Sequence, residues 1–294
     1  MIEKYERACK IAFEVLQETK PLIKPGAKLL EIAEAAEAKI REKGAKPAFP
    51  ANISINEVAA HFTPEDDSTA VIGEKDIVKL DVGVHVDGFI GDNALTVDLS
   101  NENGKLVEAA EKALDAAICT IHSGVKIGDV GAEVEAAIKG YGYKPIENLT
   151  GHSLGEYELH AGVEIPNIGN KDPTQLSEGM VIAIEPFATN GEGRVSESPD
   201  VEIFSFSEKI PVRMRESRRL LNYAEENFHT LPFAERWLSK DFRSKLLLHA
   251  ALKELVFSAA LKQYPILKES GKGLVSQAEV TVVVEKDAAR VLTK

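Results

Sequence analysis

The first two hundred residues contain an internal repeat, and this repeat limits the possible folds more than any other feature. A shift of 98 positions brings Gly26 onto Gly124 and Gly44 onto Gly142. The other matching pairs are Lys28 and Lys126, Ile32 and Val130, Glu37 and Glu135, Ile40 and Ile138, and the dipeptides Lys46-Pro47 and Lys144-Pro145. Glycine and proline restrict backbone geometry, so one offset that keeps them over 22 residues (26–47) indicates a duplication.

Both halves of the repeat have the same predicted order of elements. Apolar residues recur at helical spacing in two segments of each half, and a glycine interrupts the pattern between them. A β-rich run follows, and it ends at Asp81 in the first half and at Glu185 in the second. Two halves that deliver a carboxylate at the same place predict a site on a pseudo-twofold axis. The predicted helices are 3–20 and 26–43, then 105–122 and 128–141.

Two aspartates interrupt the apolar strands of the first half. Asp81 stands in one predicted strand and Asp92 in the next, although Asp is rare in strands and a buried carboxylate without partners is costly. Asp87-Gly88 between them is a hairpin signal. A turn at 87–88 places Asp81 opposite Ala94, on the same face as Asp92. A turn at 86–87 places Asp81 directly opposite Asp92, and either register aims both carboxylates at one point.

Two glutamates of the second half stand in similar surroundings. Glu185 follows Val-Ile-Ala-Ile, and Glu279 lies in the run Ala-Glu-Val-Thr-Val-Val-Val. Either glutamate alone is equally well explained as a solvent-facing strand residue. Four acids in apolar strands are not explained in this way, because like charges held at one point repel each other unless a cation lies between them.

Three of the seven histidines precede β-rich runs. His152 lies between Gly151 and Gly155, His160 follows, and His61 occupies the corresponding region of the first half. A lone histidine is more often a hydrogen-bonded structural residue than a ligand. Three at repeat-related positions favour a functional role.

These side chains suggest a metal site. Four carboxylates and one imidazole suit Mn²⁺, Fe²⁺, Co²⁺ or Zn²⁺ and argue against a thiolate site. Four anionic carboxylates neutralise two dications, and such a pair lowers the pKa of a bridging water and polarises a carbonyl, which is the chemistry of amide hydrolysis. The candidate ligands are Asp81, Asp92, His152, Glu185 and Glu279.

Composition excludes several other classes of protein. The chain has 47 acidic and 35 basic residues, a net charge of −12, whereas a dedicated nucleic-acid-binding protein needs a basic face. The N-terminus has no apolar run of a signal peptide, and no segment is as apolar as a membrane span. Cys9 and Cys119 are too few for a disulfide framework, and we expect both to be buried thiols. We therefore expect a cytoplasmic protein, not associated with membranes and monomeric.

The segment 205–268 breaks the pattern of the repeat. Its strongest signal is a long amphipathic run from Lys245 to Gln263, which predicts a helix. Within it, 208–245 holds nine basic and six acidic residues, a local charge of +3 in a chain of −12. This basic face suits contact with ribosomal RNA, and a plain solvated helical face is the alternative. The basic residues are Lys209, Arg213, Arg215, Arg218, Arg219, Arg236, Lys240, Arg243 and Lys245.

Four motifs resemble those of methionine aminopeptidase type 2 in its short archaeal form. They are K-L-D-V-G-V-H-V-D-G-F-I-G-D-N-A, G-H-S-L-G-E-Y-E-L-H-A-G, I-E-P-F-A-T and Q-A-E-V-T-V-V-V, and the resemblance covers essentially the whole chain. It implies the α/β (α+β) pita-bread fold, with two pseudo-symmetric halves around a dinuclear metal site. On this basis residues 1–204 plus 269–294 form the catalytic domain, and 205–268 form a helical insertion subdomain.

The resemblance also implies an activity. Such an enzyme removes the N-terminal initiator methionine from nascent proteins when the second residue is small. A hydroxide activated by two divalent ions (Co, Mn, Fe or Zn) attacks the peptide carbonyl. Nascent polypeptide N-termini are then the substrate, and the ribosome is a partner to be tested.

Individual residues take roles by their match to the family motifs. The five candidate ligands match the metal-binding positions, with Asp92 and Glu279 bridging the ions. Glu185 also matches the proton shuttle. His61 and His160 match the histidines that line the substrate site and assist catalysis, and His61 matches the one that reacts with fumagillin-type epoxides. Phe49 and Leu159 match the methionine pocket.

The subtype rests on one spacing. Glu185 and Glu279 are 94 residues apart, which leaves room for an insertion that type 1 enzymes lack. Eukaryotic type 2 enzymes carry a charged N-terminal extension, so we expect the archaeal form. Prolidase and aminopeptidase P share the fold and metal set but usually have a further N-terminal domain. A non-catalytic pita-bread binding protein is the other alternative, although such relatives have lost ligands that stand here.

Overall fold

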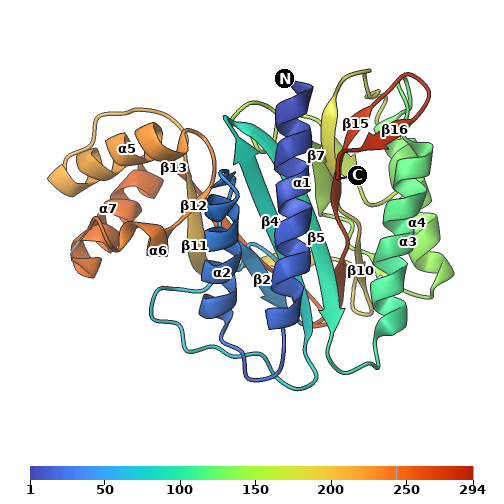
Figure 1. Cartoon of the computed structure of the whole chain (residues 1–294), viewed down its shortest axis with the longest axis horizontal. Coiled ribbons are helices and arrows are strands. Elements are labelled where there is room, and N and C mark those ends of the chain that lie inside the picture. Colours follow the sequence, from blue (N-terminus) through green and yellow to red (C-terminus); the bar gives the residue numbers. More distant parts are fainter. Residues whose placement is uncertain (243, 294) are drawn as a thin grey trace.

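The duplicated sequence forms two equivalent pairs of helices. We describe them from a computed structural model, which covers residues 1–242 and 244–293 (Figure 1). In Figure 1 the first pair covers the central strands, and the second pair stands at the right-hand side. Each helix lies within a few residues of its predicted segment. The pairs are α1 (Ile2–Thr19) with α2 (Leu29–Glu42), joined through η1 (Lys20–Leu22), and α3 (Gly104–Thr120) with α4 (Ile127–Gly140).

The matching glycines of the repeat occupy matching turns. Gly26 and Gly124 have φ angles of 79° and 87°, a left-handed conformation that glycine adopts without steric cost. The N–H of Gly26 donates to the carbonyl of Ile72 (2.7 Å), and that of Gly124 donates to the carbonyl of Leu176 (2.8 Å). The repeat is therefore one of backbone geometry as well as of sequence.

A four-stranded sheet forms the centre of the first half. In its β4–β5 hairpin Asp81 pairs with Ala94. Asp87 and Gly88 have φ angles of 50° and 89°, which is the turn geometry that matches the twist of a hairpin. The turn at 87–88 is therefore confirmed, and the alternative register is wrong. The strands are β1 (Lys46–Pro47), β2 (Asn52–Ile55), β4 (Ile77–Val86) and β5 (Phe89–Asp98).

The second half contains a five-stranded sheet in the order β16-β15-β9-β7-β8. The two halves meet where Ala94 of β5 pairs with Glu279, one residue before β15. The junction therefore runs past the predicted carboxylates. The strands are β7 (Thr150–Ser153), β8 (Glu164–Pro166), β9 (Val181–Ile184), β15 (Val280–Val284) and β16 (Ala289–Val291), and a further sheet joins β6 (Lys144–Pro145), β10 (Phe187–Thr189) and β14 (Val275–Gln277).

The segment 205–268 contains strands as well as helices. The helix predicted over 245–263 ends at Phe257, so the end of that prediction is wrong. Ala259 has a φ of 62°, which stops the helix, and Leu261 already pairs with Phe206 of β11. The elements here are β11 (Val195–Phe206), α5 (Arg215–Phe228), β12 (Phe233–Ala234), α6 (Glu235–Leu238), α7 (Lys245–Phe257) and β13 (Leu261–Glu269).

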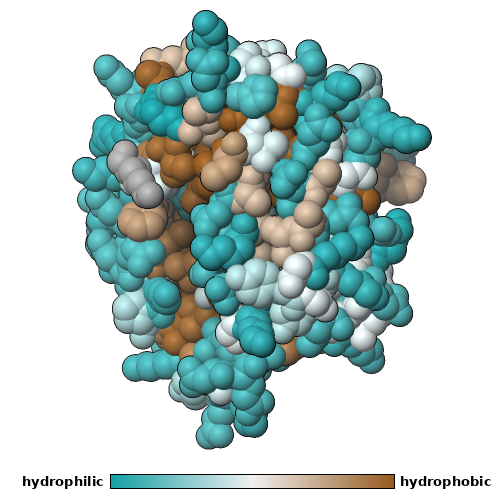
Figure 2. Space-filling model, turned by 90° about the vertical axis from the view of Figure 1, so that its right-hand side faces the viewer, coloured by the Kyte–Doolittle hydropathy of each residue, from teal (hydrophilic) through white to brown (hydrophobic). Residues whose placement is uncertain are grey.

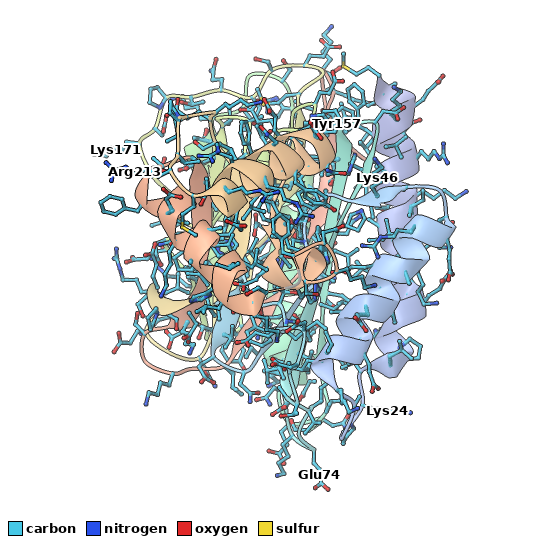
Figure 3. All side chains as sticks on the ribbon, turned by 90° about the vertical axis from the view of Figure 1, so that its left-hand side faces the viewer. Lys24, Lys46, Glu74, Tyr157, Lys171 and Arg213 are labelled. Atoms are coloured by element: carbon cyan, nitrogen blue, oxygen red, sulfur yellow. The ribbon has the colours of Figure 1, made fainter. Side chains whose placement is uncertain are left out.

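The helices of this segment pack around their own apolar core. Leu220 of α5, Phe233 of β12 and Leu252 of α7 belong to it, and all three are buried. Strand β13 also pairs with β3 (Val58–Ala60), so the segment is joined by a sheet to the first half. Figure 3 views the molecule from this side, with α5–α7 in front of the strands and α1 and α2 to their right.

The side of the molecule that carries α3 and α4 is shown in Figure 2. It is mostly hydrophilic, and a band of hydrophobic residues crosses it. Among the residues described here, no helix is long and apolar enough to cross a membrane. Cys9 is buried as predicted, but Cys119 is exposed near the end of α3, so the prediction for that thiol is wrong.

Candidate active site

The β4–β5 hairpin places Asp81 and Asp92 on one face. Asp81 lies opposite Ala94 and Asp92 opposite Gly83, so the two carboxylates are diagonal neighbours. Asp92 is only 3% exposed. In each aspartate the Oδ1 atom is buried and has no hydrogen-bond partner within the described chain. Such an oxygen is costly to bury, and it is a ready ligand for a cation.

Glu279 reaches the same face from the other side of β5. Its N–H donates to the carbonyl of Ala94 (3.1 Å), and the N–H of Ala94 donates to the carbonyl of Glu279 (3.2 Å). The side-chain amide of Gln277 donates to Oε2 of Glu279 (3.1 Å). One carboxylate oxygen is thereby oriented, and the other remains for a ligand.

His152 and Glu185 come from neighbouring strands of the second half. His152 in β7 pairs with Ala183 of β9, and Glu185 stands two residues beyond Ala183. The Nε2 atom of His152 lies 3.4 Å from Oε1 of Glu185 and 3.8 Å from Oδ2 of Asp92. Ligand atoms of Asp92, His152 and Glu279 all lie within 4.8 Å of one another.

Burial shifts the pKa values of all four acids upward, and repulsion between the carboxylates adds to the shift for Asp92, Glu185 and Glu279. Burial is the larger cause, and it raises the pKa of Asp81 to about 7. The pKa values of Asp92, Glu185 and Glu279 are also well above their usual range, because each carboxylate is desolvated and faces the others. Burial lowers the pKa of His152 to about 4, so its imidazole is neutral. Desolvated acids and a neutral imidazole are the donor set that a divalent cation stabilises.

His61 and His160 line the same pocket as this cluster. Nδ1 of His61 is 3.2 Å from the carbonyl oxygen of Pro265, and because a carbonyl only accepts, Nδ1 carries the proton. The rings of His160 and His152 lie 4.4 Å apart. Burial lowers the pKa of His61 to about 4 and that of His160 to about 3. Both imidazoles are therefore neutral at pH 7.

All nine side chains predicted from sequence line a single pocket, and Phe49 and Leu159 give it an apolar wall. Five lining residues were not predicted, and two of them come from the long strands of 195–269. Tyr264 was missed because it directly follows the segment predicted as a helix, which in the structure has already become strand β13 at Leu261. Ile203 gave no chemical signal. The five are Asn52, Ala60, Ile203, Pro232 and Tyr264.

Comparison with known proteins identifies the family. Residues 3–209 match the model of Metallopeptidase family M24. The chain belongs to family M24. The methionine aminopeptidase of Thermococcus kodakarensis is 50% identical over 98% of this chain and 97% of its own length. The methionine aminopeptidase of Archaeoglobus fulgidus is 48% identical over 99% of this chain and 98% of its own length.

Solved structures show the same fold at low identity. A thermophilic Arx1 superposes with a TM-score of 0.88 at 19% identity, covering 99% of this chain and 90% of that one. The methionine aminopeptidase of Thermotoga maritima gives 0.72 at 24%, covering 100% and 96%. The prolidase of Pyrococcus furiosus gives 0.65 at 22%, covering 100% of this chain but 63% of its own. The predicted pita-bread fold is thus confirmed.

Membership in M24 makes the chain a metal-dependent peptidase. The residues present fit such a group, because buried carboxylate oxygens without partners converge with a neutral imidazole. The family match ends at residue 209, shortly before α5. The M24 model therefore covers both halves of the repeat but not the helices of the 205–268 segment.

Proposed function

We propose that this M24 chain removes the N-terminal methionine from proteins whose second residue is small. One observation carries the proposal. The acid cluster, two neutral histidines and the apolar side chains of Phe49 and Leu159 share one pocket, in a chain 50% identical to a methionine aminopeptidase over nearly its full length. An apolar wall beside a hydrolytic centre suits a thioether side chain and leaves the scissile carbonyl near the acids.

Two divalent ions complete the proposed centre. Asp81, Asp92, His152, Glu185 and Glu279 would hold them, with Asp92 and Glu279 shared between the two. Co, Mn, Fe or Zn suits these ligands. When bound, the ions supply a Lewis acid for the carbonyl and lower the pKa of a water molecule.

The protein's own side chains position the peptide and move its proton. Glu185 accepts the proton of the attacking water on a carboxylate oxygen and delivers it to the nitrogen of the leaving amine. His61, whose Nε2 keeps its lone pair, accepts a hydrogen bond from an N–H of the peptide and so holds it in place. His160, which is neutral, donates to the carbonyl oxygen and stabilises the charge that develops there. Phe49 and Leu159 contact the methionine side chain and exclude water from it.

We assign the chain to the type 2 subclass, with residues 205–268 as an insertion in a catalytic domain of 1–204 plus 269–294. Phe206 pairs directly with Leu261, so the chain leaves and re-enters the sheet at neighbouring positions. Pro232 and Tyr264 reach the pocket from the α5–β12 loop and from β13. The insertion thus supplies part of the pocket wall.

A peptide assay tests this function. The purified chain, supplied in turn with each candidate metal, should release free methionine from Met-Ala-Ser but not from Met-Phe-Ser, whose bulky second side chain is the matched control. Cleavage of Xaa-Pro peptides instead would identify a prolidase or an aminopeptidase P. A folded, metal-loaded chain that hydrolyses neither class would be a binding protein.

We also propose that the insertion contacts ribosomal RNA near emerging nascent chains. The structure makes the basic face smaller than the sequence predicts, because Arg236 is buried and Lys245 pairs with Asp66 and Asp67. The predicted contribution of Arg243 lies outside the described residues. Arg218 and Arg219 remain on the exposed side of α5, and Arg213 lies at the outer edge in Figure 3.

Ribosome pelleting at low salt tests this contact. Phosphate contacts weaken steeply with salt, so wild-type protein should pellet at low salt and be released as salt rises. Arg218→Glu/Arg219→Glu should stay in the supernatant, and Lys112→Glu/Lys139→Glu on α3 and α4 is the charge-matched control. Equal pelleting of all three proteins would exclude the RNA contact.

A further inference from the structure

Two threonine hydroxyls replace backbone hydrogen bonds at the junction between the halves. In a regular antiparallel ladder, the residues two positions from the Ala94–Glu279 pair would also bond to each other through their backbones. One such pair is Asp92 and Thr281. Instead, the N–H of Asp92 donates to Oγ1 of Thr281 (2.8 Å), and the same Oγ1 donates to the carbonyl of Asp92 (2.9 Å).

The other side of the junction repeats this arrangement. The N–H of Gln277 donates to Oγ1 of Thr96 (2.9 Å), and the same Oγ1 donates to the carbonyl of Gln277 (2.7 Å). Thr281 is fully buried and Thr96 is 9% exposed. The two strands therefore touch at the Ala94–Glu279 pair and diverge on both sides of it, with one hydroxyl in each gap.

The strand pairings show that this is a local twofold arrangement. Asp81 pairs with Ala94, and the pairing of Ile184 with Val280 places Glu185 opposite Glu279. Ala94 and Glu279 are thus equivalent. By the same relation Thr96 is equivalent to Thr281, and Gln277 to Asp92. The hydrogen bonds between Thr281 and Asp92 are therefore the twofold equivalent of those between Thr96 and Gln277.

We propose that Thr281 and Thr96 are positioning residues that set the separation of Asp92 and Glu279, and with it the affinity for the metal ions. Thr281 holds the backbone of Asp92 directly. Thr96 holds the backbone of Gln277, whose side-chain amide holds Oε2 of Glu279 (3.1 Å). This inference rests on the metal centre of the proposed function but not on which peptide is cleaved.

Threonine suits this position because its hydroxyl donates and accepts at once, and its branched Cβ restricts the rotamer. Valine has the same shape but can neither donate nor accept a hydrogen bond. Thr281→Val would leave the buried N–H and carbonyl of Asp92 unpaired, and the strands would close or shift to compensate. Partners of metal ligands typically change metal affinity or activity by about 10–100-fold when they are removed.

Metal titration of the metal-free chain tests the proposal without any peptide. Isothermal titration calorimetry with Mn²⁺ and with Co²⁺ gives dissociation constants for wild type, Thr281→Val, Thr281→Ser, Thr96→Val and Thr189→Val. The last is the matched control, because Thr189 is fully buried, its Oγ1 accepts from the N–H of Gly191 (3.0 Å), and among the described residues its hydroxyl has no hydrogen bond to a candidate ligand. Urea unfolding in EDTA reports the stability of each metal-free chain.

We expect Thr281→Val and Thr96→Val to weaken binding by about 10–100-fold, and Thr281→Ser to return within about threefold of wild type because it keeps the hydroxyl. Thr189→Val should lose stability but bind metal like wild type. If Thr281→Val does not fold, Thr96→Val tests the same junction from its other side. Wild-type dissociation constants in a folded valine variant, or equal weakening in Thr189→Val, would overturn the proposal. Failure to cleave Met-Ala-Ser would not affect it.

Discussion

Asp81 and Glu279 are both paired directly with Ala94, from opposite sides of strand β5. Side chains paired across a sheet project to the same face, so one alanine brings together acids almost two hundred positions apart. The alanine itself is small and buried (7% exposed). The centre of the site is therefore built on the interior of a sheet, where desolvation makes the charges costly without cations.

Removing metal should make stability fall as pH rises. The pKa of Asp81 is raised to about 7, against an unfolded value of about 4, so the folded metal-free chain binds more protons than the unfolded one. Stability contributed by this group is present below pH 4 and is lost as pH rises through 7. Asp92, Glu185 and Glu279 shift in the same direction.

Thermal unfolding between pH 5 and 8, with EDTA and with excess Mn²⁺, measures this effect. The melting temperature in EDTA should fall with pH, and the difference between the two curves should widen. Metal binding displaces protons from the acids, so the metal affinity should rise with pH. The rise should be about tenfold per pH unit for each proton displaced, at pH values below the raised pKa values. Parallel curves would mean that the acids do not bind the metal.

Glu279→Ala should bind less metal while keeping its fold. It removes one of the proposed ligands, whereas the Ala94 pairing uses only backbone atoms of residue 279. We expect the metal content after dialysis to drop from two ions per chain toward one or none, with an unchanged circular dichroism spectrum. Unchanged stoichiometry would show that Glu279 is not a ligand.

Glu185→Gln should reduce turnover of Met-Ala-Ser by about 10²–10⁴ if proton transfer is the main role of Glu185. The variant must be assayed with metal in excess, and its metal content measured, because Glu185 is also a proposed ligand. A fall in kcat with metal bound supports the shuttle. Near wild-type turnover in a metal-replete variant would refute it.

The sequence predicted that the four acids lie together because a charged side chain contradicts the composition of a buried strand. Asp81 and Asp92 stood out among apolar neighbours, and the Asp87-Gly88 turn settled their register. The internal repeat did not identify equivalent histidines correctly. Ser54 pairs with Lys79 as His152 pairs with Ala183, so Ser54, not His61, is the first-half equivalent of His152.

The pocket wall from the 205–268 segment could not be predicted in the same way. Pro232 lies in the α5–β12 loop and Tyr264 in β13, and their places in the pocket depend on where this segment lies against the first half. The position of this segment depends on a contact that no local pattern reveals. Buried Glu37 of α2 accepts hydrogen bonds from Arg236 and Trp237, which lie about two hundred positions away.

Breaking the Glu37–Arg236 pair should be strongly destabilising. Both side chains are at least 96% buried, and removal of one partner leaves an uncompensated charge, at a typical cost of about 3–5 kcal/mol. Urea unfolding of Glu37→Leu, Arg236→Met and the double variant measures the free energy of unfolding. The double variant should lose much less of it than the sum of the losses of the two single variants. Lys75→Met, which breaks an exposed pair with Glu102, is the control and should cost less than about 1 kcal/mol. Additive losses would mean that the pair is not coupled.

A fumagillin-type epoxide should alkylate His61 rather than His160. The bond from Nδ1 of His61 to the Pro265 carbonyl fixes the tautomer, so Nε2 keeps its lone pair. The neighbouring wall of Phe49 and Leu159 would hold an apolar inhibitor body and make the attack effectively unimolecular. Peptide mass mapping should place the adduct on the peptide that contains His61. His61→Ala should lose labelling, whereas His160→Ala should keep it.

The pH dependence of this labelling distinguishes a buried histidine from an ordinary one. Only the neutral imidazole is a nucleophile, and the pKa of His61 is lowered to about 4 by burial. The labelling rate should therefore be nearly constant from pH 8 down to 5.5. A histidine with an unperturbed pKa of about 6.5 would lose about tenfold over the same range. An adduct on His160, or undiminished labelling of His61→Ala, would show that the roles of the two histidines are exchanged.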